Sequence, residues 1–590
     1  MDNNIDLHTL RHSCSHIMAQ AVQNLYPNAK LAIGPAIDNG FYYDFDIEGV
    51  SLTDEDLKKI EDEMKRLVKM DLTFEKHYIE DVQKQIDEFK AQGEIYKAEL
   101  LEEHKNDNPT LYLTKDKDGN VLFNDLCSGP HIDSTKRIKA FKLLSVAGAY
   151  WRGCEKNKML QRVYATAFLT KEDLNNYITM VEEAKKRDHR KLGTQLDLFS
   201  IHDEIGSGLV LWHPNLALVR ENIENYWREE HRKRGYVIVN TPHIAKSKLW
   251  EISGHIDHYK ENMFFVQKEE DSDEQFIIKP MNCPFHILIY NSCRRSYRDL
   301  PIRMAELGTV YRKEKSGALG GLTRVQGFTQ DDAHIFCTPE QLVNEINEII
   351  DFVNDAMKIF NMSFEVELST RPESYVGELA NWERAEAGLK EAMDKRGMKY
   401  DINEGDGAFY GPKIDFKFKD AIGRTWQCAT IQLDFNLPQR FNLKYQDKDG
   451  ELKTPVMLHR VVFGSMERFH GILIEHYAGA FPVWLSPIQA AIVPIAERHN
   501  EYCEKLFFEM KNKGIRVHFD DRAESMNYKI RDCLQNKKIP YVVVIGDKEI
   551  EENTLAIRKR GKGQIGTMNK DEFIEKLLIE NKTKGEISID

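Results

Sequence analysis

The segment Thr309-Val310-Tyr311-Arg312-Lys313-Glu314 closes a β-rich run that begins at Met304. A loop of residues 315–322 follows, and residues 323–329 are again suited to a strand. Few helix-length segments alternate regularly with the strands of this central region, so we expect the strands to pair mostly antiparallel. The central part of the chain is therefore predicted to contain an antiparallel sheet.

Two further segments flank this sheet in the sequence. A helix is expected from about Asn215 to a glycine cap at Gly235, followed by a β-branched strand that ends at Pro242. On the C-terminal side lies Gly464-Ser465-Met466-Glu467-Arg468-Phe469. In order and spacing, these segments and the 309–329 region resemble motifs 1, 3 and 2 of class II aminoacyl-tRNA synthetases. The resemblance implies a class II antiparallel sheet flanked by helices, and a homodimer formed through the first motif.

The resemblance assigns the arginines of these motifs to ATP. In amino-acid activation a carboxylate attacks the α-phosphate, and planar guanidinium groups suit the charge that spreads over the phosphoryl oxygens. Arg312 would hold the α-phosphate and the carboxylate, Arg468 would pack on the adenine and reach the γ-phosphate, and Phe328 would stack on the other face of the ring. Magnesium should accompany ATP. The implied ATP-binding residues are Arg312, Glu314, Arg324, Phe328, Gln427, Thr430 and Arg468, and the implied catalytic residues are Arg312, Lys413 and Arg468.

Three more stretches narrow the substrate: residues 280–284, 327–334 and 457–460. They resemble the places where threonyl-tRNA synthetases supply a cysteine and two histidines, here Cys283, His334 and His459, to one zinc ion per subunit. Three protein ligands leave a fourth position open for substrate. Such a site could bind the threonine hydroxyl and reject valine, which would leave that position unsatisfied. The other implied substrate contacts are Gln330, Asp332, Tyr410 and Gln432.

The N-terminal region contains a second group of potential ligands. His12 and His16 are four residues apart, which places them on one helical face, and Cys127 and His131 have the same spacing. From the residues alone, this pattern is a respectable metal site. The region also resembles the editing domain shared by threonyl- and alanyl-tRNA synthetases, which implies a pocket that hydrolyses mischarged seryl-tRNA. We favour metal-free hydrolysis over a second zinc, because neutral imidazoles can activate water. Further implied substrate neighbours are Tyr42, Lys97 and Asp125.

Short apolar strands separated by helix-length amphipathic segments follow residue 484, which predicts a small α/β domain. It resembles the anticodon-binding domain of several class II synthetases, with Glu549 and Arg558 at positions that contact anticodon bases. Threonine tRNA is therefore an expected partner, beside ATP and threonine. The expected fold is a multidomain α+β chain with an α/β editing domain (1–169), a linker helix (170–191), a catalytic domain (192–483) and an α/β anticodon-binding domain (484–590).

Length and composition agree with this division. A chain of 590 residues exceeds what one core usually serves, and 41% hydrophobic with 30% charged residues is typical of a globular protein. Nine dispersed cysteines without a CxxC pair argue against a disulfide framework. The N-terminus lacks a signal-peptide pattern and no apolar run reaches membrane-spanning length, so we expect a cytoplasmic protein without a membrane partner. The net charge of −13 decides nothing about RNA, because phosphate contacts depend on local basic faces.

Two features depart from the family pattern. Many members begin with a small extra domain ahead of the editing domain, and here Met1 lies eleven residues before His12, so we expect that domain to be absent. Phe285 stands where glycine is more usual, and its ring could reshape the pocket wall beside Cys283.

Three alternative functions stay open at this point. Another class II synthetase, such as prolyl or seryl, is disfavoured by the Cys/His/His set together with the editing pocket. A paralogue that does not charge tRNA would be expected to lose Arg312, Arg468 or a zinc ligand, and all are present. A metal-dependent hydrolase built on the N-terminal histidines would leave two-thirds of the chain unexplained.

Overall fold

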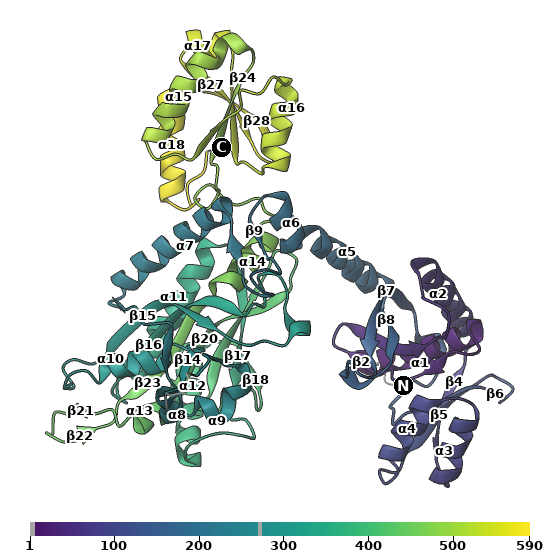
Figure 1. Cartoon of the computed structure of the whole chain (residues 1–590). Helices are drawn as coiled ribbons and strands as arrows, with labels where there is room; N and C mark the ends of the chain where they lie inside the picture. The colour runs from purple at the N-terminus through teal and green to yellow at the C-terminus, as the bar shows by residue number, and fades with distance from the viewer. Residues whose placement is uncertain (1–5, 269–273, 590) are drawn as a thin grey trace. The chain divides into compact units, whose positions relative to one another are not determined.

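The computed structural model describes residues 6–268 and 274–589, which form two compact units divided after Glu182 (Figure 1). Each unit has its own hydrophobic core. Helix α5 (Lys171–Arg187) crosses the boundary between the units. Within the described ranges, none of the helices has both the length and the apolar character needed to span a bilayer.

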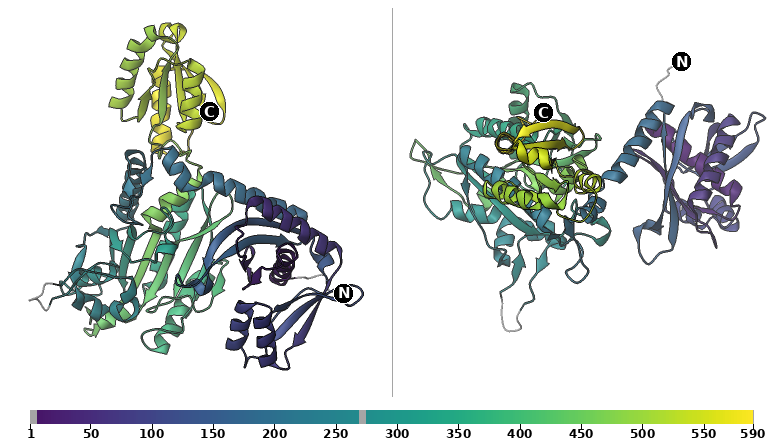
Figure 2. Two further views of the ribbon diagram at one scale, coloured as in Figure 1. Left: turned by 45° about the vertical axis from the view of Figure 1, so that its right-hand side comes forward. Right: turned by 90° about the horizontal axis from the view of Figure 1, so that it is seen from above.

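The N-terminal unit contains two sheets. In the larger one, the order is β1-β3-β8-β7 with β2 paired to β3, and helices α1 and α2 pack on it (Figure 2). The smaller sheet, β4-β5-β6, packs against α3 and α4. Their bounds are α1 Leu7–Leu25, α2 Asp54–Lys69, α3 Val82–Ala91, α4 Ile95–Glu103, β1 Lys30–Leu31, β2 Ala36–Ile37, β3 Gly40–Asp46, β4 Thr73–Tyr78, β5 Thr110–Lys115, β6 Val121–Leu126, β7 Ala140–Tyr150 and β8 Met159–Phe168.

The linker helix ends earlier than predicted. Asp188 has a non-helical backbone conformation (φ −48°, ψ 119°) and interrupts the helix between α5 and α6 (His189–Gln195). Its carboxylate accepts a hydrogen bond from the backbone N–H of Arg190 at 2.8 Å, so it acts as the N-cap of α6. The charged segment expected to form one helix from 170 to 191 therefore forms two.

The second unit is built on an eight-stranded sheet in the order β11-β15-β16-β23-β20-β19-β17-β18. In this sheet, each pairing from β15 through β16, β23, β20 and β19 to β17 is antiparallel. The described edge strands are parallel to their neighbours, β11 to β15 and β18 to β17. The predicted antiparallel sheet is thereby confirmed. The strands are β11 Val237–Ile238, β15 Ile302–Tyr311, β16 Gly327–Cys337, β17 Ser363–Ser369, β18 Asp401–Asn403, β19 Lys413–Lys419, β20 Thr425–Asp434 and β23 Val456–Ser465.

Successive side chains of each strand point to opposite faces of the central sheet, so one face is apolar and the other polar. Ala333, Ile335 and Leu458 belong to the main core, into which helices on one side of the sheet also pack. The intervening residues, such as His334 and His459, point to the opposite face, because successive side chains of a strand alternate. The main flanking helices are α7 Pro214–Lys233, α11 Leu342–Ile359, α12 Leu379–Lys395 and α14 Met466–His476.

The C-terminal part is a five-stranded sheet in the order β25-β24-β26-β27-β28. Strands β24, β25 and β26 are parallel, whereas β27 and β28 join antiparallel. Helices α15 and α18 cover one face and α16 the other (Figure 1). This is the expected small α/β fold, with β24 Ala490–Pro494, β25 Val517–Phe519, β26 Tyr541–Ile545, β27 Thr554–Lys559, β28 Gly563–Asn569, α15 Asn500–Asn512, α16 Met526–Arg531, α17 Asp547–Glu551 and α18 Lys570–Lys582.

Candidate functional site

Two adjoining cavities open on the polar face of the central sheet. One, of about 200 Å³, is lined by a thiol, two imidazoles and several polar groups: Cys283, His334, His459, Asp332, Tyr410 and Gln432. The other, of about 470 Å³, is lined by Glu314, Arg324, Phe328, Gln427 and Arg468. Arg312, Gln330 and Thr430 line both cavities. A group bound in one cavity would therefore meet a group bound in the other beside Arg312.

The three expected zinc ligands converge in the smaller cavity. One atom from each of Cys283, His334 and His459 lies within 4.8 Å of the others, and all three residues are buried. Strand register explains part of this, because His334 of β16 is paired directly with His459 of β23. Cys283 comes from the first residue of α10 (Cys283–Tyr290). One thiol with two imidazoles is a donor set that suits zinc.

Hydrogen bonds determine which imidazole nitrogen is left with a lone pair. His459 Nε2 lies 2.9 Å from the Asp434 carboxylate, which can only accept, so Nε2–H donates and Nδ1 keeps its lone pair. Glu306 likewise accepts from His286 Nε2 at 3.2 Å, so His286 Nδ1 accepts from His334 Nδ1 at 2.9 Å. His334 therefore keeps its lone pair on Nε2. Each histidine is held in a tautomer with one nitrogen able to bind a metal.

The pKa shifts of Cys283, Asp332 and His334 are compatible with a bound cation. Burial, together with Asp332 and Asp434, raises the pKa of the Cys283 thiol well above its ordinary value. Burial also raises the pKa of Asp332 and lowers the pKa of His334, so the latter stays neutral. A dication would stabilise the thiolate and the carboxylate, and neutral imidazole is the form that binds metal.

The larger cavity has the character of a nucleotide site. The Arg312 guanidinium lies 5.1 Å from the centre of the Phe328 ring, which leaves an aromatic face beside a fixed positive charge. Arg468 Nε donates to Thr323 O at 2.9 Å, and Arg324 Nε donates to Glu314 at 3.0 Å. Glu314, expected to accept from adenine, is thus paired with Arg324 in this structure.

A buried carboxylate, Asp415, organises the edge of the same face. Gln427 Nε2 and Thr430 Oγ1 each donate to it at 2.8 Å, and Lys413 Nζ forms an ion pair with it at 2.8 Å. Lys413 also contacts Asp406 at 3.1 Å. One side chain that was not predicted from the sequence therefore holds Gln427 and Thr430, assigned to ATP, and Lys413, assigned to catalysis.

Asp331 fixes the turn that precedes Arg468. Its fully buried carboxylate accepts the backbone N–H groups of Val462, Phe463 and Gly464 at 2.8–3.1 Å. Gly464 has φ +77° in this turn, a conformation in which glycine avoids the strain of a side chain. The segment carrying Arg468 is therefore anchored to β16 through buried hydrogen bonds.

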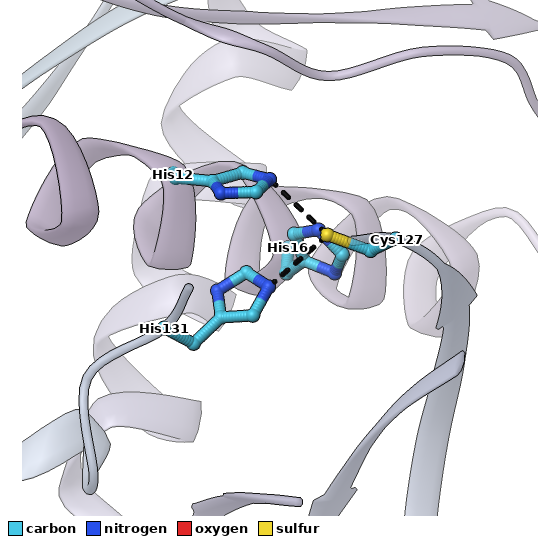
Figure 3. Close-up of side chains that lie close together, drawn as sticks. All are labelled: His12, His16, Cys127 and His131. Atoms are coloured by element: carbon cyan, nitrogen blue, oxygen red, sulfur yellow. Dashed lines mark hydrogen bonds between the residues drawn. The ribbon is translucent and has the colours of Figure 1, made fainter. Parts of the chain in front are cut away.

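The N-terminal unit brings its four candidate residues to one point (Figure 3). Cys127 Sγ lies 3.3 Å from Nε2 of His12 and 3.3 Å from Nε2 of His131. His12 and His16 come from successive turns of α1. A cavity of about 500 Å³ opens beside His12, His16 and Cys127.

A buried polar network lies behind His16. The Asp125 carboxylate accepts from Tyr43 OH at 2.7 Å and lies 3.3 Å from His16 Nδ1. Lys97 forms an ion pair with Asp125 and donates to Tyr43 OH at 2.8 Å. All four side chains are buried, and Lys97, Asp125, Tyr43 and His16 also line the cavity. The carboxylate beside Nδ1 favours a proton on that nitrogen, which would leave the lone pair of His16 on Nε2.

Burial keeps this cluster uncharged. It lowers the pKa of His12, His16 and His131, and it raises the pKa of Cys127 to about 11. At neutral pH the cluster therefore contains neutral imidazoles and a thiol. Neutral imidazole can take a proton from water, as metal-free hydrolysis requires.

Three known protein families match successive parts of this chain. Residues 264–477 match the tRNA synthetase class II core domain (G, H, P, S and T), residues 489–580 the anticodon binding domain, and residues 114–164 the threonyl and alanyl tRNA synthetase second additional domain. The threonine–tRNA ligase of Carboxydothermus hydrogenoformans is 54% identical over 574 residues, which cover 97% of this chain and 89% of that protein. The chain belongs to the threonine–tRNA ligase family.

Further similarities agree with this family. The threonine–tRNA ligase of Acetivibrio thermocellus is 55% identical over 576 residues, covering 97% of this chain and 88% of that protein. Among solved structures, the RNA binding domain of threonyl-tRNA synthetase from Cryptosporidium parvum Iowa II matches with a TM-score of 0.64 and 42% identity, over 66% of this chain and 98% of that one. The predicted multidomain α+β fold, with a class II core and an anticodon-binding domain, is confirmed.

The structure places Phe285 and the two predicted anticodon-contacting residues as follows. Phe285 packs against Trp250 with ring centres 5.8 Å apart, and it is not among the described residues that line the Cys283 cavity. Its ring belongs to a separate apolar cluster with Trp250, Met263 and Ile277. Glu549 lies on α17, where it accepts from Gly546 N at 2.9 Å, and Arg558 lies on β27; their contacts with RNA stay predictions.

Some residues that support the two sites were not predicted from the sequence. In the N-terminal unit, Tyr43 and not the predicted Tyr42 donates to Asp125, and the centre of the Tyr42 ring lies 3.9 Å from the Arg162 guanidinium. Strand alternation within β3 could have separated this pair, because neighbouring residues face opposite sides. His286 and Asp434 carried no comparable signal, because their role depends on contacts with other segments.

Proposed function

We propose that this chain activates threonine with ATP and transfers it to threonine tRNA in the two adjoining cavities of the central sheet. A Cys/His/His donor set lies at one end, an arginine- and aromatic-lined cavity lies at the other, and Arg312 faces both. This juxtaposition carries the proposal, because activation requires an amino-acid carboxylate to meet the α-phosphate of ATP.

Each part of the larger cavity has a proposed task. Arg312 binds the α-phosphate and the threonine carboxylate, and its fixed charge stabilises the phosphoryl oxygens during attack. Phe328 stacks on adenine from one side and Arg468 from the other. Glu314 accepts from the adenine amino group, after exchanging Arg324 for the nucleotide. Asp415 holds Lys413, Gln427 and Thr430 at the edge where substrate and nucleotide meet.

Zinc fits the smaller cavity, one ion per subunit, held by Cys283, His334 and His459. When bound, it supplies a Lewis-acid contact for the amino and hydroxyl groups of threonine. Asp332 receives a hydrogen bond from Asn282 Nδ2 at 3.0 Å, and this fixes the carboxylate that would accept from the threonine hydroxyl. Gln330, Tyr410 and Gln432 line the remaining wall. Valine would leave the hydroxyl partners unsatisfied.

Editing is proposed for the cavity beside His12, His16, Cys127 and His131. Serine retains the hydroxyl that the threonine cavity selects, so a second, hydrolytic site is needed to remove it. Water attacks the ester carbonyl of seryl-tRNA while His16 Nε2 takes a proton from that water. The ester C–O bond then breaks, His16 returns the proton to the leaving ribose oxygen, and serine and free tRNA are released. Asp125 and Lys97 hold His16 and the substrate in place. The metal-free route needs neutral imidazoles, and burial lowers the pKa of His16 and His131.

The remaining assignments are proposals of the same kind. We propose a homodimer through the segment of α7 and β11, magnesium bound with ATP, and anticodon contacts by Glu549 and Arg558. The proposed division is 1–169 for editing, 170–191 for the linker, 192–483 for catalysis and 484–590 for the anticodon. The cytoplasmic location stays a prediction from the sequence.

The test is ATP–pyrophosphate exchange with purified protein and each of the twenty amino acids, followed by charging of threonine tRNA. We expect a strong signal with threonine, a weaker one with serine and a negligible one with valine. Exchange with a different amino acid would move the chain to a sister synthetase. Absence of exchange from folded, zinc-loaded protein would favour the paralogue that does not charge tRNA.

A further inference from the structure

One buried histidine joins the linker segment to the nucleotide cavity. His189 is the first residue of α6 and is 5% exposed. Its Nδ1 lies 2.6 Å from the Glu475 carboxylate of α14, so Nδ1–H donates to that carboxylate. Nε2 consequently has a lone pair, and it accepts the backbone N–H of Leu322 at 3.0 Å. Both ring nitrogens therefore form hydrogen bonds, Nδ1 with α14 and Nε2 with the turn that contains Leu322.

The turn held by Nε2 leads directly to the proposed ATP contacts. Leu322 is fully buried. The carbonyl of the next residue, Thr323, accepts from Arg468 Nε at 2.9 Å. The residue after that, Arg324, pairs with Glu314. Three consecutive residues thus have partners outside the turn: Leu322 bonds to His189, Thr323 to Arg468, and Arg324 to Glu314.

Close packing prevents this turn from shifting easily. A Cβ added at Gly321 would lie 2.1 Å from His189 Nε2, and Gly321 also has φ +52°. On the other side, a Cβ at Gly471 of α14 would lie 3.2 Å from Leu322 Cβ. The turn therefore rests tightly between the His189 ring and α14, and its position depends on both surfaces.

We propose that His189 is a positioning residue for ATP binding, which holds residues 320–324 so that Arg324 and Arg468 are set for the nucleotide. The inference rests on the proposed ATP-binding role of those arginines. It adds a role for the linker: the residue at the start of α6, directly after the helix that leaves the N-terminal unit, sets the geometry of the nucleotide cavity. Loss of either bond to the imidazole would loosen the turn.

The test compares three single variants in threonine-dependent ATP–pyrophosphate exchange. His189→Phe removes both hydrogen bonds and keeps a ring, and His189→Gln retains an amide oxygen that can accept from Leu322. The matched control, Leu192→Ala, removes a buried side chain of α6 that belongs to the main core and makes no hydrogen bond to the turn. Hydrogen–deuterium exchange of residues 316–326 in each protein reports the mobility of the turn directly.

We expect His189→Phe to raise the KM for ATP about tenfold, the effect of losing about 1.4 kcal/mol, while the KM for threonine changes less than about twofold. His189→Gln should fall between His189→Phe and wild type. Exchange of the turn's amides should accelerate in His189→Phe and stay unchanged in Leu192→Ala.

An ATP KM within twofold of wild type in His189→Phe, or an equal rise in Leu192→Ala, would overturn the inference. Arg468→Ala separates this failure from failure of the ATP site. An Arg468→Ala effect on ATP without a His189→Phe effect overturns the positioning role alone. No Arg468→Ala effect on ATP overturns the proposed nucleotide site and the positioning role with it.

Discussion

Replacing Asp434 by asparagine should weaken zinc binding without removing any metal ligand. One Asp434 oxygen accepts from the backbone N–H of Asn436 at 2.6 Å and of Leu437 at 3.0 Å, and the other accepts from His459 Nε2 at 2.9 Å. The asparagine oxygen can preserve the two backbone bonds. Its NH₂ group would then face His459 Nε2–H, and this donor–donor contact favours the other tautomer. In that tautomer the proton occupies Nδ1, the nitrogen that zinc needs.

The expected magnitude follows from the position of Asp434 directly behind a ligand. Loss of such a partner typically weakens metal affinity by about 10- to 100-fold, which corresponds to about 1.4–2.7 kcal/mol. Zinc affinity can be measured by competition with a chromophoric chelator, together with the KM values for threonine and ATP in exchange. The KM for threonine should rise at limiting zinc, while the KM for ATP should change less than about twofold, because the nucleotide cavity is untouched.

Asp420→Asn is the matched control, since Asp420 is also a buried carboxylate but bonds to Arg424 and the backbone of Ile422, away from the cavity. Zinc affinity of Asp434→Asn within twofold of wild type would refute the tautomer argument. An equal loss in Asp420→Asn would refute it as well, because a general loss of stability would then explain both.

Arg312, His16 and Cys127 can each be tested separately. Arg312→Lys should lower kcat/KM for exchange by about 100-fold, because a point charge replaces a planar donor group, and a loss under fivefold would argue against its bridging role. Hydrolysis of seryl-tRNA should change less than about twofold between pH 7.5 and 6, because burial lowers the pKa of His16; an ordinary imidazole would lose about fourfold of its neutral form. As pH falls, His16 in the unfolded chain takes up a proton near its ordinary pKa of about 6.5, whereas buried His16 in the folded protein stays neutral. Protonation therefore favours the unfolded state, and the free energy of unfolding of the N-terminal unit should fall below about pH 6.5. Urea denaturation at several pH values measures this change. Alkylation of Cys127, followed by peptide mass spectrometry, should still accelerate from pH 8 to pH 10, since its pKa is about 11, and a plateau near pH 9 would contradict the buried thiol.

The extent to which sequence could predict this site depends on the range of the interactions. Alternation within β16 suffices to place Gln330, Asp332 and His334 on one face, and spacing suffices to align His12 with His16 on a helix. Local patterns also predicted the antiparallel sheet and the C-terminal α/β fold.

Local sequence patterns could not predict contacts between segments that are far apart in the chain. The pairing of His334 with His459 spans more than a hundred residues, and it was anticipated only from the family resemblance. Asp415 and Asp434 were missed because a buried carboxylate has no sequence signature of its own; its partners depend on strand order. The break at Asp188 was missed because charge density favoured continuing the helix, although Asp is a common N-cap.

The proposed threonine site can be tested by measuring ATP–pyrophosphate exchange with threonine and with valine, in protein stripped of zinc and then reloaded with it. We expect one zinc per chain, loss of threonine-dependent exchange on stripping, recovery on reloading, and negligible exchange with valine in the reloaded protein. Full threonine exchange in metal-free protein, or equal exchange with valine after reloading, would contradict a threonine site built on Cys283, His334 and His459.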